Sequence, residues 1–438
     1  MENLLHSFFK RYGNPSKPVL LGLSGGPDSL ALFTLLLKYK NAHTLNLAVA
    51  HIDHQWREES GREAQFLREK VEHHGLSFHL KTLQPGTLSG NLEACCRQER
   101  LAFFRDLCQC YGYQAVFLGH HADDQAETVL KRLLEGASGP YLSGLRESTH
   151  IEGVTLWRPF LQLTKKEILT WLERQNLKGF EDKTNRDPTF MRGRMRTHIL
   201  PLLGQAFGKQ VHSSLVQVGE EAAEWRVYLD DRLAELLTSI EECPWGFFLE
   251  LNSKVHRYEI KYLLRRLCEK MGGGLSRSGL ETAADLIQAG AADKQVGKGA
   301  MKLYIDRGRL FLPRVERKPL SQRHPLKEGT IEGWRVQVTR ADRPEQASNW
   351  KAAWRGECSV WLPDQEYTIG PAQLNACYTG STSLAKWWTD AKVPAYLRRW
   401  VPVICDFEGN IRHEFLTGVE PRKGEGSGPW HHLQLSFC

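Results

Sequence analysis

The first 200 residues alternate short apolar runs with longer segments whose apolar residues recur at helical spacing, and this alternation constrains the fold most strongly. Strands that alternate with helices predict a doubly wound parallel sheet, covered by helices on both faces. Ligands of such sheets bind beside the carboxyl ends of the strands. The expected strands are Val19–Ser24, Leu45–Asp53, Phe78–Leu83, Ala115–Gly119 and Thr155–Trp157, and the expected helices are Asp28–Lys38, Glu63–His74, Asn91–Tyr111 and Asp123–Leu134.

After Pro201 the pattern changes, and residues 211–289 are predicted to be mainly helical. A β-like stretch follows at Ala300–Pro313, with Gly308 as its turn. The polar segment Arg317–Gly329 carries two prolines and is expected to be a linker. The last hundred residues are rich in Trp, Gly and Pro, which favours a small α+β domain. We therefore expect three domains, at residues 1–205, 211–316 and 330–438.

The composition excludes several classes of protein. The longest apolar stretch, Leu30–Leu37, is far too short to cross a bilayer, and no signal peptide is recognised, so we expect a cytoplasmic protein without a membrane partner. The ten cysteines include no Cys-x-x-Cys pair, which favours buried reduced thiols over a metal site. A net charge of +7 allows a polyanionic partner such as RNA without requiring one.

The segment at residues 24–29, Ser-Gly-Gly-Pro-Asp-Ser, joins an apolar strand directly to an apolar helix. Its glycines let the backbone approach a phosphate closely, and the N–H groups of the helix N-terminus attract an anion. Ser24 and Ser29 add hydroxyl donors, and Asp28 can hold Mg²⁺ on the phosphates. A capped turn without function is the alternative, but six matched positions between strand and helix favour a phosphate loop.

This loop lacks the lysine of the Gly-x-x-x-x-Gly-Lys-Ser/Thr motif. It resembles the loop of the ATP-pyrophosphatase (PP-loop) group. Members of that group cleave ATP between the α and β phosphates and transfer AMP to a substrate oxygen. The resemblance therefore implies an enzyme that uses ATP and releases pyrophosphate.

Polar side chains follow two further strands at the same sheet edge. The second strand ends in the segment that carries His51, His54 and Arg57, which suit contact with a triphosphate or a developing negative charge. Asp124 and Glu127 are three residues apart at a helix start, hence on one face, and can bind Mg²⁺ or the ammonium of an amine substrate. Helix capping and surface polarity explain the neighbouring residues His120, His121 and Asp123 equally well when each is taken singly.

Together these segments are similar to the tRNA(Ile)-lysidine synthetase family, and the resemblance covers most of the chain. Two positions depart from the family's pattern: Gly193 stands where Asn is usual, and Gln55-Trp56 stands where a glycine-containing pair is commoner. The matching segments are the phosphate loop, His51-x-x-His54-x-x-Arg57, Asn91–Arg100, Gly119–Thr128, Arg158-Pro159, Phe180–Asn185, Arg192-x-Arg194-x-Arg196, Ile199–Pro201 and Ala391–Ile404.

The resemblance implies a bacterial ligase that forms a carbon–nitrogen bond in tRNA modification. Such an enzyme adenylates O2 of the wobble cytidine in an isoleucine tRNA with a CAU anticodon. The ε-amino group of free L-lysine then displaces AMP to give lysidine. The implied co-substrate is ATP, the implied cofactor is Mg²⁺, and the implied partners are tRNA(Ile) and free L-lysine. A homodimer is possible, and the resemblance does not decide whether the protein forms one.

The resemblance also implies roles for individual residues. Asp124 and Glu127 would hold the amino end of lysine, and Arg97 or Arg100 would face its carboxylate. Asp28 and Asp124 would hold Mg²⁺. These five residues form the expected catalytic set, and the expected ATP-binding residues are Ser24, Gly25, Gly26, Pro27, Asp28, Ser29, His51 and Gly119.

Candidate RNA contacts are basic residues outside this set. Arg257, Lys261 and Arg265 recur every four residues and form one stripe on a predicted helix. A solvated face of an amphipathic helix explains the stripe somewhat better than RNA contact. Arg192, Arg194 and Arg196 are the other candidates.

Three other functions compete with this interpretation. Another PP-loop tRNA-modifying enzyme, such as a 2-thiolase, would need suitably placed cysteines, typically Cys-x-x-Cys. An amidotransferase-linked ligase would need a glutaminase domain, often with an N-terminal cysteine, whereas residue 2 is Glu2. A non-enzymatic RNA-binding protein with a decayed ATP site would have no need to keep Asp28, Asp124 and Glu127.

Overall fold

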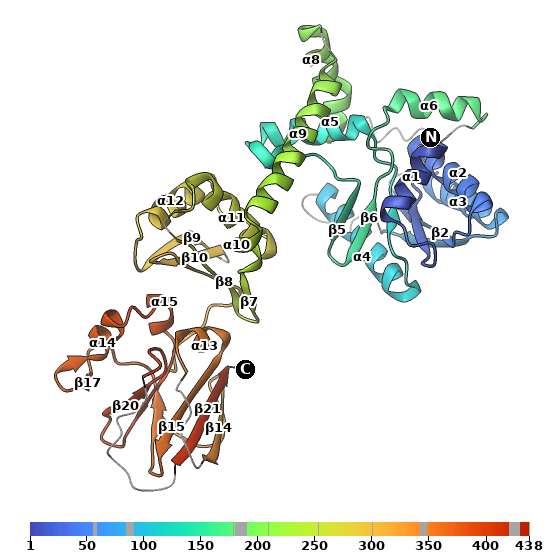
Figure 1. Cartoon of the computed structure of the whole chain (residues 1–438). Helices are drawn as coiled ribbons and strands as arrows, with labels where there is room; N and C mark the ends of the chain where they lie inside the picture. The colour runs from blue at the N-terminus through green and yellow to red at the C-terminus, as the bar shows by residue number, and fades with distance from the viewer. Residues whose placement is uncertain are drawn as a thin grey trace. The chain divides into compact units, whose positions relative to one another are not determined.

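The computed structural model describes residues 1–55, 59–84, 92–177, 179, 191–208, 210–252, 254–299, 301–341, 348–419 and 430–437 (Figure 1). Contacts group the chain into two compact units, residues 1–228 and residues 229–438. The sequence predicts three domains instead, and that division stays a prediction. Within the described ranges, no helix is long and apolar enough to cross a membrane.

Unit 1 is built on a six-stranded sheet with the order β3-β2-β1-β4-β6-β5. All neighbouring strands are parallel except β5 and β6. Strand order reverses at β1, because β2 lies on one side of it and β4 on the other. The predicted doubly wound parallel sheet is thereby confirmed. The strands are β1 (Val19–Gly22), β2 (Leu47–Asp53), β3 (Ser77–Thr82), β4 (Val116–Phe117), β5 (Ser148–Ile151) and β6 (Val154–Trp157).

Strand β1 is apolar on both faces, as a strand in the middle of a parallel sheet must be. Val19 and Leu21 point into a core shared with α1, α2, α3 and α6, whereas Leu20 points into a second core formed with α4. Helices α1 and α6 and the edge strand β5 were not predicted from the sequence. The helices of this part are α1 (Glu2–Tyr12), α2 (Pro27–Ala42), α3 (Ser60–His73), α4 (Leu92–Tyr111), α5 (Ala122–Leu134), the 3₁₀ turn η1 (Gly139–Leu142) and α6 (Lys165–Arg174).

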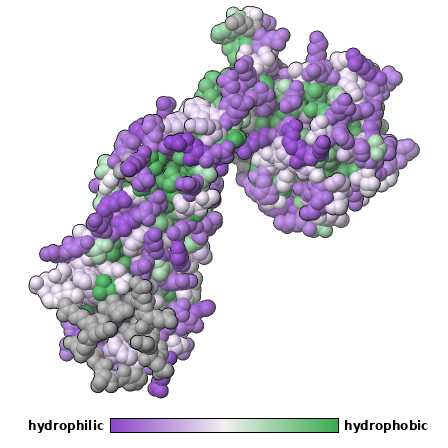
Figure 2. Space-filling view, viewed as in Figure 1, coloured by the Kyte–Doolittle hydropathy of each residue, from purple (hydrophilic) through white to green (hydrophobic). Residues whose placement is uncertain are grey.

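A continuous helical run leads out of the sheet domain. It consists of α7 (Met191–Arg194), the π-helical turn η3 (Met195–Ile199) and α8 (Leu200–Phe207), and α9 (Val211–Arg232) follows. Met195 and Leu200 pack with Leu130 of α5, which anchors the run to the sheet domain. Helix α8 exposes apolar side chains: Leu202 and Phe207 are 65% and 69% exposed. They belong to the green surface at the top of Figure 2.

Unit 2 begins with the end of α9 and the short helix α10 (Ala234–Thr238). A five-stranded antiparallel sheet, β7-β8-β11-β10-β9, packs with α11 and α12. The predicted β-stretch is the hairpin β10–β11, while β7 and β8 were not predicted. The bounds are β7 (Glu241–Cys243), β8 (Gly246–Glu250), α11 (Arg257–Lys270), α12 (Arg277–Gln288), β9 (Lys294–Lys298), β10 (Met301–Asp306) and β11 (Arg309–Pro313).

The rest of unit 2 contains two four-stranded sheets, β12-β16-β19-β20 and β13-β14-β21-β15, and the hairpin β17–β18. The strands are β12 (His324–Pro325), β13 (Gly329–Ile331), β14 (Trp334–Ala341), β15 (Glu357–Pro363), β16 (Thr368–Gly370), β17 (Cys377–Thr379), β18 (Thr382–Ser383), β19 (Val403–Cys405), β20 (Ile411–Glu414) and β21 (Trp430–Phe437). The helices are α13 (Trp350–Arg355), α14 (Leu384–Asp390) and α15 (Ala395–Arg398).

One core joins the two parts of unit 2. Phe248 and Phe311 of the five-stranded sheet belong to the same buried cluster as Trp334 and Trp354. The segment expected to be a linker starts inside this cluster: the Arg317 guanidinium lies 3.9 Å from the ring centre of Trp400 and is buried. A buried cation on an aromatic face is stabilised by the ring quadrupole and by the lack of competing water.

The carboxylate of Glu414 is the buried acidic group of this core and depends on nearby donors. Trp388 Nε1–H donates to it at 2.7 Å, and the Leu416 N–H donates at 2.8 Å. Trp387 Nε1–H lies at 3.3 Å, and Trp387 is only partly buried. Because a buried carboxylate that loses a donor keeps its desolvation cost, the first of these bonds stabilises the fold more than the last.

We expect Trp388→Phe to lower the free energy of unfolding of unit 2 by at least about 1–3 kcal/mol, since it removes a donor to a buried charge. Urea denaturation of the full chain, followed by tryptophan fluorescence, measures this. Trp387→Phe is the matched control and should cost less than about 1 kcal/mol. Equal costs for the two variants would show that ring packing, not the hydrogen bond to Glu414, stabilises this region.

Candidate active site at the sheet's switch point

The phosphate loop leaves β1 and the segment 118–121 leaves β4, so both lie where the strand order reverses. Gly25 has a φ of 84°, a conformation that side chains disfavour. Ser29 Oγ–H donates to Gly26 O at 3.0 Å, and the Ser24 N–H donates to Ser29 Oγ at 3.2 Å. Helix α2 then begins at Pro27, whose missing N–H costs nothing at the first helical position. The loop is thus closed on itself and aims a helix N-terminus at the sheet edge.

Two other segments pack against the loop so closely that only glycine fits. A Cβ on Gly119 would lie 3.0 Å from the backbone of Asp28 and Ser29. A Cβ on Gly179 would lie 2.8 Å from Pro27 Cα. Gly119, predicted to bind ATP, therefore contacts the loop itself. Residues 180–185, which carry part of the family resemblance, lie outside the described residues.

His51 lies near the carboxyl end of β2, beside this loop. Its Nδ1 lies 2.7 Å from Leu23 O and must donate to it, and burial lowers the pKa of the imidazole. A neutral ring that donates through Nδ1 keeps Nε2 as an acceptor. Gln55 has a φ of 51°, in the left-handed region that favours glycine. Trp56 and Arg57 lie outside the described residues.

Asp28 is bound by a lysine that the sequence analysis did not select. Lys165 Nζ lies 2.6 Å from Oδ1 and 2.6 Å from Oδ2 of Asp28. Lys165 is the first residue of α6, and its N–H donates to Asp123 Oδ2 at 3.0 Å. The capping box of Thr164 and Glu167 is readable as a helix start, but no local signal shows that the side chain after Thr164 reaches a loop 137 residues away.

His121 is buried among three carboxylates. Its Nε2 lies 3.8 Å from Asp28 Oδ2 and 3.5 Å from Asp124 Oδ2, and its Nδ1 lies 3.5 Å from Asp123 Oδ2. The residue is also the N-cap of α5, and its N–H donates to Asp124 Oδ2 at 3.0 Å. Helix capping therefore accounts for part of this motif, while the ring links Asp28 to the carboxylates of α5.

His120 faces arginines instead. Arg158 Nε–H donates to His120 Nδ1 at 3.2 Å. Burial, opposed by Asp124 but reinforced by Arg158 and Arg100, lowers the pKa of His120 to about 3, so the ring is neutral at physiological pH. Burial, with a smaller effect of the nearby Arg97 charge, lowers the pKa of Arg158 to about 10, which leaves it charged. Arg97 and Arg100, predicted to face lysine's carboxylate, are thus exposed residues of α4 whose charges reach this part of the site.

The buried carboxylates Asp124 and Glu127 share one cation, Arg196. Arg196 donates from Nη2 to Asp124 Oδ1 at 2.5 Å and to Glu127 Oε2 at 3.1 Å, and from Nε to Glu127 Oε1. Burial raises the pKa of Glu127 despite this partner. Burial acts in the same direction on Asp124, but His121, His120 and Arg196 together lower its pKa.

The predicted roles of these three residues are not decided by the contacts. The carboxylate pair shares Arg196, as expected for one helix face, and His121 links Asp124 to Asp28 of the phosphate loop. Arg196, a candidate for RNA, is directed at the pair from the π-helical turn. A long-range pair of this kind has no signature in sequence, although a π-helical turn often marks a functional position.

The donor set fits Mg²⁺. Asp28 offers two carboxylate oxygens at the mouth of the loop, and oxygen is the ligand that Mg²⁺ prefers. Among the described residues, no group of three or more His, Cys, Asp or Glu side chains is arranged to hold a metal. Mg²⁺ commonly takes one or two carboxylates and completes its shell with phosphates and water, so the carboxylate of Asp28 alone would fit an ion of this kind.

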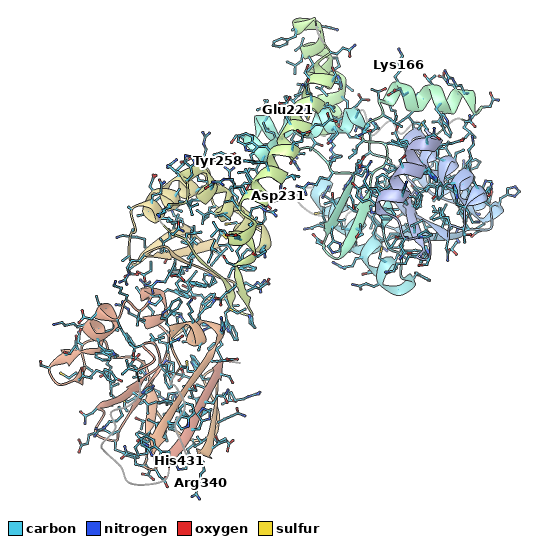
Figure 3. The ribbon with its side chains drawn as sticks, viewed as in Figure 1. Lys166, Glu221, Asp231, Tyr258, Arg340 and His431 are labelled. Atoms are coloured by element: carbon cyan, nitrogen blue, oxygen red, sulfur yellow. The ribbon has the colours of Figure 1, made fainter. Side chains whose placement is uncertain are left out.

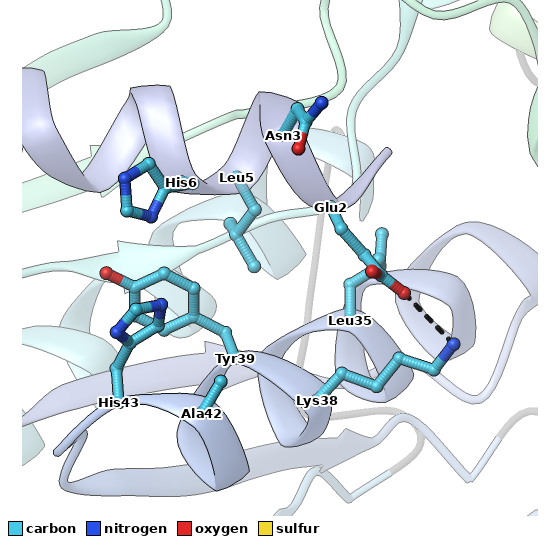
Figure 4. A pocket seen from close by; sticks show the side chains of 9 residues that line it. All are labelled: Glu2, Asn3, Leu5, His6, Leu35, Lys38, Tyr39, Ala42 and His43. Atoms are coloured by element: carbon cyan, nitrogen blue, oxygen red, sulfur yellow. Dashed lines mark hydrogen bonds and ion pairs between the residues drawn. The ribbon is translucent and has the colours of Figure 1, made fainter.

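Two pockets lie in unit 1. One of about 540 Å³ is lined by Ala122, Asp123 and Thr164 beside the site and by residues of α8 and α9. The other, about 200 Å³, contains His6, Tyr39 and His43 together with the Glu2–Lys38 ion pair of 3.1 Å (Figure 4). This second pocket lies at the end of α2 opposite to the phosphate loop, and so it is not part of the site.

The basic stripe of α11 is paired within unit 2. Arg257 lies 2.5 Å from Glu281 and 2.8 Å from Asp285, and Lys261 lies 3.0 Å from Glu281. These ion pairs join α11 to α12 and favour a role in helix packing. Contact of Arg257, Lys261 and Arg265 with RNA stays a prediction, as it does for Arg192 and Arg194.

We expect Arg196→Met to lower the free energy of unfolding of unit 1 by about 3–5 kcal/mol at pH 8, because it leaves two buried carboxylates without their cation. The loss should be smaller at pH 5. The pKa of Glu127 is already raised by burial and rises further without Arg196. As the pH falls, Glu127 therefore becomes protonated, and the cost of burying an unpaired carboxylate charge is removed.

Chemical denaturation at the two pH values measures this effect. Arg194→Met is the matched control, because Arg194 is exposed on the same helical run. A loss for Arg196→Met that does not depend on pH would mean that packing of the side chain, not its charge, is responsible.

Comparison with known proteins agrees with this geometry. A family model described as a PP-loop domain matches residues 1–203. The tRNA(Ile)-lysidine synthase of Protochlamydia amoebophila is 37% identical over 99% of this chain and 96% of its own length. That of Chlamydia muridarum is 36% identical over 61% of this chain and 84% of its own. Among solved structures, the U34-tRNA thiolase NcsA of Methanococcus maripaludis is 20% identical with a TM-score of 0.42, over 51% of this chain and 79% of its own. The similarity along the whole chain to the first relative shows that this protein belongs to the tRNA(Ile)-lysidine synthase family.

Proposed function

We propose that this chain is a ligase that joins free L-lysine to the wobble cytidine of tRNA(Ile) and uses ATP to do so. The observation that carries this proposal is the similarity over nearly the full length of both chains to a tRNA(Ile)-lysidine synthase. The site supports it, since a phosphate loop and a buried carboxylate pair meet at one sheet edge.

The reaction has two steps. O2 of cytidine attacks the α-phosphorus of ATP, and the bond between the α-phosphorus and the bridging oxygen breaks to release pyrophosphate. The ε-amine of lysine then attacks C2, the C2–O2 bond breaks, and AMP leaves with O2 while the amine gives up its protons to solvent or a nearby base. The loop at residues 24–29 and the N-terminus of α2 are placed to bind the phosphates. Mg²⁺, held by Asp28, would offset charge on the phosphates in the first step.

Asp124 and Glu127 are proposed to hold the amino end of lysine. Arg196 already contacts both carboxylates, and His121 N–H occupies one oxygen of Asp124. A carboxylate oxygen accepts more than one hydrogen bond, so an ammonium can join Arg196 on the pair or displace it. Arg97 and Arg100 are proposed to face the carboxylate of the same lysine.

The thiolase alternative has less support. Cys95, Cys96, Cys108 and Cys110 all lie on α4 and are free thiols. Burial raises the pKa of Cys108 to about 11, so this thiol is protonated rather than nucleophilic at neutral pH. The proposal places the enzyme in the cytoplasm, where tRNA, ATP and lysine meet.

The full chain should transfer radiolabelled lysine to bulk tRNA only when ATP is present, with AMP and pyrophosphate as products. Thin-layer chromatography of the nucleotide products and acid precipitation of the tRNA measure both halves of the reaction. Asp28→Ala should abolish both while the circular dichroism spectrum stays unchanged. ADP and phosphate as products, or no labelled tRNA, would refute the assignment.

Glu127→Gln should raise the half-saturating lysine concentration about ten- to a hundred-fold, because a charge-assisted hydrogen bond worth roughly 1.5–3 kcal/mol is lost. The half-saturating ATP concentration should change much less. Steady-state kinetics with each substrate varied in turn measure the two effects. Glu135→Gln is the matched control on the exposed end of α5 and should behave as the parent chain. An equal effect of Glu127→Gln on both substrates would assign Glu127 to the scaffold of the site instead.

A further inference from the structure

We propose that Lys165 is a catalytic residue of the nucleotide site. In the empty protein its ammonium group holds Asp28. When Mg²⁺ replaces the ammonium on Asp28, the ammonium of Lys165 binds the phosphates of ATP. The proposal rests on the proposed use of ATP at the phosphate loop and assigns a residue to it. It supplies the cation that the loop lacks in its own sequence.

The contact is made by a fixed backbone and a mobile side chain. Helix α6 starts at Lys165 with a capping box, in which the Thr164 N–H donates to Glu167 Oε2 at 2.7 Å and Thr164 Oγ1 accepts from the Glu167 N–H at 3.2 Å. The Lys165 N–H is held by Asp123. The chain position is therefore well determined, while four methylene groups let Nζ move by several ångströms.

The ion pair is accessible rather than sealed in the core. The side chain of Lys165 is 34% exposed and that of Asp28 is 24% exposed. Both oxygens of Asp28 face the same ammonium at 2.6 Å. Because a partly exposed pair in water is worth little, a ligand that offers the ammonium a better anion can separate it.

The chemistry of the loop requires such a cation. Cleavage between the α and β phosphates builds negative charge on the departing pyrophosphate, and a fixed or delivered positive group lowers the barrier. Arg196, a second cation near Asp28, is held by Asp124 and Glu127. Lys165 contacts the loop directly, and Asp28 is the one anionic partner of its ammonium among the described residues.

Lys165 contacts both oxygens of Asp28, and its charge would repel Mg²⁺ at the same carboxylate. In the empty protein the ammonium therefore competes with the metal for Asp28. With ATP bound, Nζ gains phosphate oxygens, and Asp28 is released for the metal. Metal and nucleotide should then favour each other's binding, and by thermodynamic linkage the coupling is the same in both directions.

The test compares Lys165→Met with Lys166→Met in the full chain. Lys166 is the next residue of α6, is exposed, and points away from the sheet domain (Figure 3). Mn²⁺ binding without nucleotide is followed by electron paramagnetic resonance, and ATP binding with Mg²⁺ by equilibrium dialysis. Neither measurement contains tRNA or lysine, so a failure of the lysidine reaction leaves this test intact.

Lys165→Met should bind Mn²⁺ about ten-fold more tightly than the parent chain, because a competing cation is gone. It should bind MgATP about ten- to a hundred-fold more weakly, as expected for a lost charge-assisted bond to phosphate. Lys166→Met should match the parent chain in both. Lys165→Arg keeps the charge and should retain most of the ATP affinity and the low Mn²⁺ affinity.

Unchanged ATP binding in a folded Lys165→Met variant would overturn the proposal, whatever happens to Mn²⁺. Weaker ATP binding without tighter Mn²⁺ binding would also overturn it, since Lys165 would then only support the shape of the site. If Lys165→Met does not fold, as judged by its circular dichroism spectrum, the Lys165→Arg variant is the test. Loss of ATP binding in a folded Lys165→Arg variant would contradict a role for the positive charge.

Discussion

The reversal of strand order at β1 is the constraint on which the rest of unit 1 depends. Because β2 and β4 flank β1, the loops that leave β1 and β4 share one edge of the sheet. Gly119 then packs so tightly on the backbone of the phosphate loop that a side chain here would force the loop to shift. A helix N-terminus and a helix that carries two carboxylates are thereby brought together, although their sequences are about a hundred residues apart.

Charge balance in this site is reached by pairing rather than by exposure. Asp28 has Lys165, and the carboxylates of α5 have Arg196, while His121 lies between the two pairs. Ion pairs such as these add little to stability, whether they are buried or partly exposed. Under the proposed function, each of these cations holds a carboxylate in place until a metal or a substrate ammonium takes over the contact.

The sequence was sufficient for features that depend on local pattern. Apolar runs and helical spacing predicted the parallel sheet, and the glycines of residues 24–29 predicted the turn at Gly25. The contacts of Lys165 and Arg196 could not be found in this way, because their partners are 137 and 69 residues away and no local pattern encodes such distances. The shared core of unit 2 was missed for a related reason: polar residues and prolines at 317–329 indicate a linker, while burial of Arg317 depends on aromatic rings from distant segments.

The π-helical turn at Met195–Ile199 gives the helical run one residue more than an α-helix would need. An α-helix turns by about 100° for each residue, so the extra residue sets the angle between Arg196 and everything that follows in α8. Loss of one residue from this turn would swing either the guanidinium away from its carboxylates or α8 away from its packing on α5. The length of this single turn therefore couples the ion pair in the site to the packing of α8 on α5.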